Sequence, residues 1–229
     1  MNLDEAIAVL RGRLDDEIVP YLWSNADFIS YFNQRRNDFA RRTEYFRDSS
    51  TAAICTLTMS TSTADYALDT RIVDVKRAKP SWMTIPLKKV TVGFMDENTP
   101  GWEDSDTSTQ PYRFILDKLT GYLTVWPTPA SAIGTVKLTV SRLPLTQLAL
   151  SHIGLSTPTE LDFPLMWQET LLEAVMGLAY AKPDSQTRDQ GKAQEYSQKW
   201  ERFIMVDMVQ YMTKQGSSDE DQPDYYRER

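Results

Sequence analysis

The sequence predicts an α+β protein in which N- and C-terminal helices form a bundle and a large, hairpin-rich, all-β insertion separates them. Apolar residues recur at helical spacing in residues 1–48 and again in 151–214, whereas apolar and polar side chains alternate in residues 49–150. Residues 215–229 are acidic and polar, as is typical of a flexible tail. Neither helical end can bury its apolar stripe alone, so we expect the two ends to pack on each other.

Two helices are expected before the β-rich part. Apolar residues at helical spacing predict a short amphipathic helix that ends near Pro20. Ser24 followed by Asp27 has the form of a capping box, which predicts the start of the second helix. Phenylalanines then recur every seven residues, at Phe32, Phe39 and Phe46. This spacing predicts a helix of about 22 residues with one aromatic face.

The second helix also carries the locally basic stretch of the chain. Its arginines are Arg35, Arg36, Arg41, Arg42 and Arg47, and the acids among them are Asp38, Glu44 and Asp48. The favoured interpretation is a solvated helix face with ion pairs inside the helix. The alternative is a surface that meets an acidic partner or a DNA backbone.

The central part is rich in Thr, Val and Pro and predicts a series of short strands. The expected strands are residues 53–59, 70–76, 90–95, 112–116, 122–126 and 135–141. The fourth and fifth form a hairpin around the turn DKLTG, where Gly121 supplies the positive φ that such a turn needs. Residues 95–111 contain five acids and two prolines, which predicts an exposed, mobile loop.

Helical spacing returns in the C-terminal part. One helix is expected from the stripe of Leu165, Leu172, Val175 and Ala179, with Pro183 limiting its end. A second helix is expected over residues 187–214. Its stripe is formed by Tyr196, Trp200, Phe203 and Val206. The second helix becomes apolar nearly all round at FIMVDMVQYM, which indicates burial on more than one side, as another subunit would provide.

The sequence contains few residues or motifs that would indicate a catalytic, cofactor or metal site. Phosphate-binding, dinucleotide-binding and nucleophile-elbow glycine motifs are absent from the sequence, and the single cysteine, Cys55, reads as a small buried hydrophobe. His152 is the only histidine, so a Cys/His zinc site is not expected. Carboxylate pairs such as Asp104 with Asp106, or Glu169 with Glu173, read as solvated acids. We therefore expect no enzyme, no cofactor and no metal.

Charge and hydropathy limit the possible partners. The formal net charge of −7 argues against a sequence-specific grip on nucleic acid, which needs a basic footprint. The sequence contains no run of about 18 apolar residues, so we expect no membrane span. The acids near the N-terminus are unlike the start of a signal peptide.

Two alternatives to a structural protein remain open at this point. The first is a β-rich module that binds a ligand such as a glycan through Trp82, Trp102 and Trp126. The second is an enzyme built on carboxylates of the central loop. These carboxylates belong to Asp96, Glu97, Glu103 and Asp104.

The order of segments resembles the head-to-tail adaptor (connector) proteins of tailed bacteriophages, and the likeness covers most of the chain. The N-terminal helix of that family matches Trp23-Ser24-Asn25, Asn33 and Ala40-Arg41-Arg42. Its hairpin matches Pro111, Tyr112, Leu116, Asp117, Gly121, Leu123, Pro127 and Pro129, and the next element matches Arg142-Leu143-Pro144. Its C-terminal helix matches Leu161-Asp162-Phe163-Pro164, Leu171-Leu172, Ala179-Tyr180 and Lys182. Trp167-Gln168 departs from the family, whose members often have an aromatic residue followed by His.

The resemblance implies a helical bundle bearing a β insert that assembles as a homo-oligomeric, usually dodecameric, ring around the DNA channel. Its expected partners are the phage portal protein and a tail or nozzle protein, with non-specific proximity to packaged DNA and no membrane. The expected location is the neck of the virion, after assembly in the host cytoplasm. An acidic channel lining would repel phosphates and let the duplex slide.

The resemblance also implies roles for individual residues. The hairpin would project toward a neighbouring subunit or tail component, with Trp126-Pro127-Thr128-Pro129 as its hinge; the alternative is that it is the edge of a β-sandwich core. Candidate hairpin residues are Tyr112, Asp117, Gly121, Trp126 and Pro127. Candidate subunit or portal contacts are Arg35, Arg36, Arg41, Arg42, Trp200, Tyr211, Tyr225 and Tyr226. Trp23 and Phe28 are further aromatic residues expected to be exposed for an interface.

Overall fold

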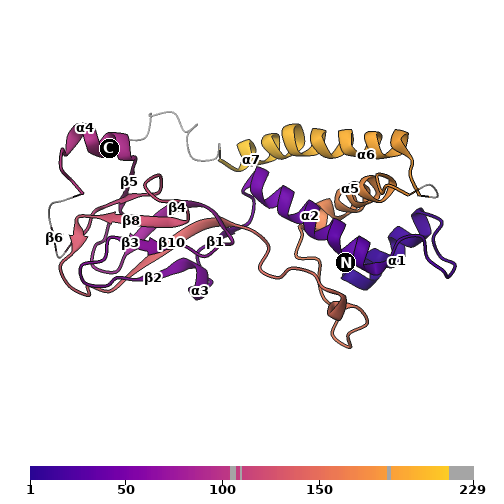
Figure 1. Ribbon diagram of the computed structural model, residues 1–229, viewed down its shortest axis with the longest axis horizontal. Helices are drawn as coiled ribbons and strands as arrows, with labels where there is room; N and C mark the ends of the chain where they lie inside the picture. Colours follow the sequence, from indigo (N-terminus) through magenta and orange to yellow (C-terminus); the bar gives the residue numbers. More distant parts are fainter. Residues whose placement is uncertain (104–106, 109, 185–186, 217–229) are drawn as a thin grey trace, which may run out of the picture. The chain divides into compact units, whose positions relative to one another are not determined.

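The computed structural model describes residues 1–103, 107–108, 110–184 and 187–216. The chain forms two compact units, one made of residues 1–43 with 144 onward and the other of residues 44–143 (Figure 1). The first unit is mainly helical and the second contains the sheets. The prediction of a chain that mixes helices with strands is therefore confirmed. Most of the predicted tail, residues 217–229, lies outside the described residues.

The helical unit begins with two helices of different length. α1 (Leu3–Arg13) starts with a capping box between Asn2 and Glu5, but it ends well before the predicted Pro20. α2 (Asn25–Thr43) starts at the predicted box, in which the amide of Asp27 donates to Ser24 Oγ and the amide of Ser24 donates to the Asp27 carboxylate. α2 ends before Phe46 because Glu44 adopts a positive φ of 51°.

The C-terminal half of the helical unit consists of two longer helical segments. The 3₁₀ turn Leu165–Trp167 precedes α5 (Gln168–Tyr180), so Leu165 stands outside the predicted stripe and is exposed. α6 (Gln190–Arg202) continues through a π-helical turn (Phe203–Asp207) into α7 (Met208–Gly216). The π turn inserts an extra residue into the helical repeat, so Ile204 and Met208 are buried and the predicted Val206 is exposed.

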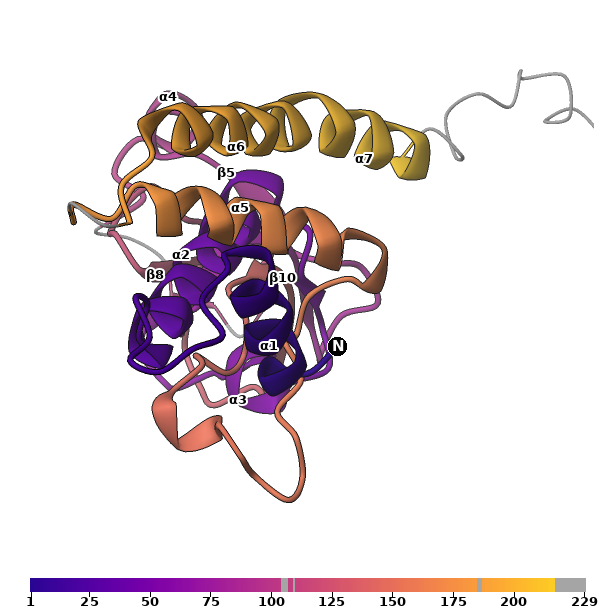
Figure 2. The same ribbon diagram turned by 90° about the vertical axis from the view of Figure 1, so that its right-hand side faces the viewer.

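The core of the helical unit is centred on α5, which lies between α2 and α6 (Figure 2). Phe39 of α2 packs its ring 4.7 Å from that of Phe163 and 6.1 Å from that of Phe203. The approach of α6 to α5 depends on Gly177, where an added Cβ would lie 2.9 Å from the Cβ of Tyr196. A side chain at position 177 would therefore push the two helices apart.

The β-rich unit contains two four-stranded sheets. In the first, β10 (Thr135–Arg142) pairs on its own with three strands, all antiparallel. These strands are β1 (Arg47–Asp48), β2 (Thr56–Thr58) and β4 (Ile72–Pro80). In the second, the order is β3 (Asp65–Ala67), β8 (Tyr122–Trp126), β7 (Arg113–Ile115) and β5 (Lys88–Val90).

Apolar side chains of both sheets share one buried cluster. Val136, Leu138 and Val140 of β10 alternate along one face of their strand, as the sequence predicts, and meet Phe114 and Val125 of the second sheet. A smaller cluster includes Val90, Met95, Trp102, Ile115 and Trp126.

Three predictions in the β-rich unit are wrong in part. The predicted strand 53–59 begins as the short helix α3 (Ala52–Cys55) before it becomes β2. The predicted strand 90–95 is mostly the helix α4 (Val92–Asn98), because Thr91 Oγ1 accepts a hydrogen bond from the amide of Phe94 and caps it. The predicted mobile loop 95–111 starts inside that helix, and its Trp102 is buried.

The predicted hairpin is present, with Arg113 opposite Trp126 and a φ of 78° at Gly121. Its strands β7 and β8 are the two central strands of their sheet, because β5 and β3 flank them. The hairpin is therefore part of the β core of this unit, but at the centre of its sheet and not at the edge that the alternative expected. The hinge is also wrong, since β9 (Thr128–Pro129) continues pairing with β6 (Thr107–Ser108) after a cis Trp126-Pro127 bond.

One buried carboxylate joins the first and last strands of the β-rich unit. Asp48 of β1 accepts hydrogen bonds from the hydroxyl of Thr51 at 2.6 Å, the amide of Ser50 at 2.8 Å and the guanidinium of Arg142 at 2.8 Å. Burial by itself would raise the pKa of Asp48, but these hydrogen bonds outweigh it and hold the pKa well below its usual range. Cys55 lies buried nearby, and burial together with the Asp48 charge raises the pKa of its thiol.

We predict that Asp48→Asn lowers the free energy of unfolding by about 2–4 kcal/mol at pH 7, because Arg142 loses its charged partner in a mostly buried setting. The pKa of Asp48 is lower in the folded than in the unfolded chain, so its contribution is complete above pH ~4 and is lost as the pH falls below that value. Urea unfolding followed by tryptophan fluorescence at several pH values measures both effects. The control Glu44→Gln breaks the exposed pair with Lys76 and should change the free energy by less than about 0.5 kcal/mol; equal losses in the two variants would contradict the prediction.

Candidate assembly surface

The four candidate arginines of α2 do not form a single exposed face. Arg36 is 1% exposed, and its guanidinium donates to the carbonyl of Thr146 at 3.2 Å. The nearest carboxylate, that of Asp162, is 3.9 Å away. Among the described residues, the buried Nε of Arg36 has no hydrogen-bond partner. Burial lowers the pKa of Arg36 to about 10 in spite of the nearby Asp162. Arg36 is thus a buried structural residue, and its expected exposure is wrong.

Arg35 and Trp200 belong to the same internal contact. Arg35 is half-buried, donates from Nε to the carbonyl of Ala174 at 3.3 Å and lies 5.5 Å above the ring of Trp200. Burial lowers the pKa of Arg35. Trp200 is 1% exposed and donates from Nε1 to Asp38 at 2.7 Å. These groups hold α2, α5 and α6 together, so the expectation that Trp200 is exposed is wrong.

Arg42 forms its main ion pair between helices. Its guanidinium donates to both carboxylate oxygens of Glu201 on α6, at 2.8 and 2.7 Å, and lies 3.6 Å from Asp38 of its own helix. The hydrogen bonds raise the pKa of Arg42 and lower that of Glu201. The favoured interpretation, ion pairs inside the helix, therefore describes only the Arg42–Asp38 contact, because the pair of Arg42 with Glu201 joins two helices.

Arg41 stands apart from the other three arginines. It is exposed, and in the part of the chain that the structure describes it forms no ion pair. Arg41 and Arg42 border a polar hollow of about 410 Å³ that also includes Asn37 and Glu201. The open positive charge of this surface is therefore concentrated on one side chain.

The aromatic residues expected at an interface are mostly internal. Trp23 is buried and donates from Nε1 to the carbonyl of Ala179 at 2.9 Å, and Phe28 is fully buried. The expectation that these two side chains are exposed is wrong. Tyr211 is half-buried with its ring 4.9 Å from that of Trp167, whereas Tyr225 and Tyr226 lie outside the described residues.

Exposed aliphatic side chains, rather than aromatic ones, mark the open surface of α7 and the π turn before it. Ile204 and Met208 are buried on the inner side, while Met205 is 64% and Val209 56% exposed on the outer side. A groove of about 200 Å³ runs beside them, between the end of α2 and α7. We call it the α7 groove. It is lined by Arg42, Thr43, Ile204, Met208, Val209, Met212 and Thr213.

A second exposed aliphatic surface was missed from the sequence. We call residues 18–22, which follow α1, the apolar loop. Ile18 is 84% and Val19 72% exposed, and Tyr21 and Leu22 are also exposed. The run IVPYL just after a group of acids was the available signal, but the predicted extension of the first helix toward Pro20 concealed it.

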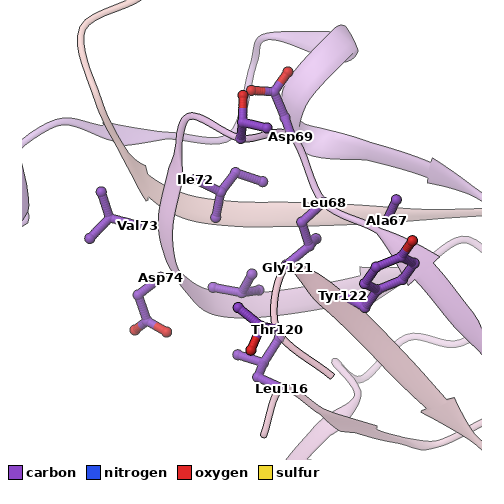
Figure 3. A pocket seen from close by; sticks show the side chains of 12 residues that line it. Ala67, Leu68, Asp69, Ile72, Val73, Asp74, Leu116, Thr120, Gly121 and Tyr122 are labelled. Atoms are coloured by element: carbon purple, nitrogen blue, oxygen red, sulfur yellow. The ribbon is translucent and has the colours of Figure 1, made fainter. Parts of the chain in front are cut away.

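The β-rich unit has a pocket of about 570 Å³ between the β3–β4 connection and the turn of the hairpin (Figure 3). Leu68, Ile72 and Leu116 give it an apolar lining. Asp69 lies at its edge, where the hydrogen bonds from Arg71 lower the pKa of Asp69 to about 2. Asp74 also lines the pocket and pairs with Lys76 and Lys89, so both acids of the lining are already paired.

The tryptophans proposed to bind a ligand do not line this pocket. Trp126 is buried and donates from Nε1 to the carbonyl of Trp102, whose own Nε1 donates to Asp96 at 2.9 Å. Trp82 is half-buried against the β core. The shared glycan-binding surface expected from these three residues is therefore not formed.

Several of the carboxylates considered for catalysis already have partners. Glu169 binds Arg13 through both oxygens, at 2.5 and 3.0 Å, and Glu103 lies 3.4 Å from Lys118. Glu97 is exposed. Asp104 and Asp106 lie outside the described residues. Over the described ranges, His, Cys, Asp and Glu side chains nowhere gather in a group of three that could hold a metal ion. His152 accepts a hydrogen bond at Nδ1 from the amide of Ala149.

A comparison with models of protein families places the chain among known proteins. A family model described as SU10 adaptor protein matches residues 1–223, which cover most of the first compact unit and all of the second. A search of curated proteins finds no match. Within the described residues, no helix is both long and apolar enough to span a membrane.

We predict that Arg36→Met leaves the free energy of unfolding within about 1 kcal/mol of the wild-type value, because methionine retains the packing and removes a poorly satisfied buried charge. Arg36→Ala should lower it by about 2–4 kcal/mol, since it leaves a cavity. Urea unfolding measures both. A loss in Arg36→Met as large as that in Arg36→Ala would show that the charge of Arg36 is itself stabilising.

Proposed function

The chain belongs to the SU10 adaptor protein family, and we propose that it is a structural protein of the phage neck: a head-to-tail adaptor that forms a ring, joins the portal to the tail and lines the DNA exit channel. The observation that carries this proposal is the family match over residues 1–223. Because the match extends through both units, it supports a role for the whole chain and not for one module alone.

The proposed architecture is a helical bundle that carries a β-rich insertion. Its support is the way in which the β-rich unit begins and ends. Arg47 lies opposite Ser141, and the amide of Arg142 donates to the carbonyl of Phe46 at 3.0 Å. The chain therefore enters and leaves this unit at neighbouring points, so a hundred-residue insertion does not require the ends of the helical part to separate.

The surfaces of the helical unit support assembly as the main role. The apolar loop and the outer side of α7 expose aliphatic side chains to solvent. Such exposed apolar surfaces are typical of sites that bind another protein. In rings formed from identical subunits, two different surfaces of each copy meet, and rotation closes the assembly. Two separate exposed apolar surfaces are what such a contact requires.

The charge distribution supports proximity to DNA without a grip on it. The formal net charge is −7, which repels phosphates over long range. Of the basic stretch, Arg36 is buried, Arg35 is half-buried and Arg42 is held by Glu201. This stretch therefore leaves few cations to bind a DNA backbone, and the net negative charge would let a duplex pass without being held.

The proposed partners are further copies of the chain, the portal protein and a tail or nozzle protein. Tyr225 and Tyr226 would contact the portal as anchors of the acidic tail. The proposed location is accordingly the virion neck, and the role is that of a connector rather than an enzyme.

We predict that mass photometry of the chain, mixed with the portal ring of the same phage, shows one discrete complex that carries about a dozen copies of the 26.3 kDa chain. The portal alone and the chain alone serve as references. A chain that stays at its free mass at every concentration, with the portal unchanged, would contradict the adaptor role.

A further inference from the structure

The helical unit exposes a protruding apolar loop and an apolar groove, and we propose that the apolar loop of one copy binds in the α7 groove of the next copy. Resting on the proposed function, this inference names the surfaces that hold the ring together. The apolar loop is residues 18–22, and the α7 groove lies between the end of α2 and α7.

Two buried charged side chains, Asp16 and Arg11, hold the conformation of the apolar loop. The carboxylate of Asp16 is buried and accepts hydrogen bonds from the amides of Leu22 at 2.7 Å and Trp23 at 3.3 Å. Arg11 is also buried, donates to Asp16 at 2.7 Å and places its guanidinium 3.6 Å from the centre of the Tyr21 ring. The base of the loop is thus fixed while its tip points into solvent.

A fixed base with an exposed apolar tip favours binding to another surface, and the tip contributes little to the fold of its own copy. Ile18, at the tip, is the most exposed large aliphatic side chain among the described residues. A loop that already has its bound conformation loses little conformational entropy on association, so more of the gain from burying Ile18 and Val19 appears as affinity. No hydrogen bond of the Arg11–Asp16 base has to break.

The α7 groove offers matching chemistry. Four apolar side chains line it, of which Ile204 and Met208 are buried and Val209 is exposed; the fourth is Met212. Methionine side chains adapt their shape to an incoming aliphatic group. Met205 and Val206 lie one turn before Val209 and extend the apolar surface beyond the groove.

Charges beside the two surfaces are complementary. Asp15 and Glu17 precede the apolar loop and are exposed, and they form no ion pair within the described ranges. Arg42 lines the groove and is already bound to Glu201, whereas its neighbour Arg41, which lines the polar hollow that Arg42 also borders, forms no ion pair with any residue that the structure describes. An acid beside the incoming loop would therefore meet an unpaired base, which favours this orientation over others.

The positions of the two surfaces make the contact head-to-tail. Within the helical unit, the segment after α1, drawn in indigo, lies at the end opposite to α7 in both views (Figures 1 and 2). The anchored loop cannot reach the groove of its own copy. Each copy thus offers one loop and one groove to different neighbours, the arrangement that a closed ring needs.

The direct test is disulfide trapping between Ile18→Cys and Val209→Cys variants assembled on the portal. Cys55 is buried and serves as the unreactive background. Mixing the two single variants should give a cross-linked dimer that neither variant gives alone, and the double variant should give a ladder of higher multimers. A cross-link in Ile18→Cys alone would show that loops meet loops, which overturns the proposal.

Matched substitutions test the energetics. Ile18→Asp should weaken ring assembly at least roughly tenfold, because a charge replaces a buried aliphatic group. Ile85→Asp, at an exposed isoleucine of the β-rich unit, should leave assembly unchanged. Glu17→Arg should also weaken assembly, and Arg41→Glu in the same chain should restore it.

The outcomes separate this inference from the proposed function. Normal rings from Ile18→Asp, without cross-links between positions 18 and 209, would overturn the loop-in-groove contact and leave the adaptor role standing. In that case the groove would be left to the C-terminal tail or to a tail protein. Failure of the wild-type chain to assemble with the portal at all would overturn both.

Discussion

The pairing of β1 with β10 is the constraint on which the rest of the β-rich unit depends. β10 is the strand to which β1, β2 and β4 all attach, so its position fixes the first sheet. Asp48 ties the short strand β1 to β10 through Arg142 and also organises the Ser50–Thr51 turn into α3. One carboxylate thus ties together the two points at which the chain enters and leaves the β-rich unit.

The helical unit follows a different rule, in which α5 supplies the apolar centre and the other helices cover it. α2 contributes Phe28, Phe32 and Phe39, and α6 contributes Trp200. These large aromatic side chains are therefore buried within a single copy of the chain. The apolar side chains that stay exposed on the apolar loop and on the outer side of α7 are, apart from Tyr21, aliphatic. In the proposed assembly, stability and subunit contacts therefore depend on different residues, and changes at Ile18 or Val209 should affect assembly more than folding.

Local chemistry made much of the fold predictable. The Ser24–Asp27 capping box predicted the start of α2, and the alternation of apolar and polar side chains predicted β8 and most of β10. Both signals involve residues that are close together in the sequence, so they can be recognised without the structure. α3 and α4 were missed because four to seven residues are too few to display a helical period. The burial of Arg36 and Trp200 depends on Thr146 and Asp38, more than a hundred residues away in sequence, and no local pattern encodes such contacts. The candidate interface residues beyond these stay predictions.

Hydrogen–deuterium exchange of the chain, free and bound to the portal ring, tests most directly whether the protein acts through its assembly surfaces. Binding should slow exchange in residues 16–23 and 203–213, and leave it unchanged around the β-unit pocket, in residues 67–75 and 116–122. Protection confined to the pocket, with the apolar loop and α7 unaffected, would contradict the account and point to a ligand-binding module instead.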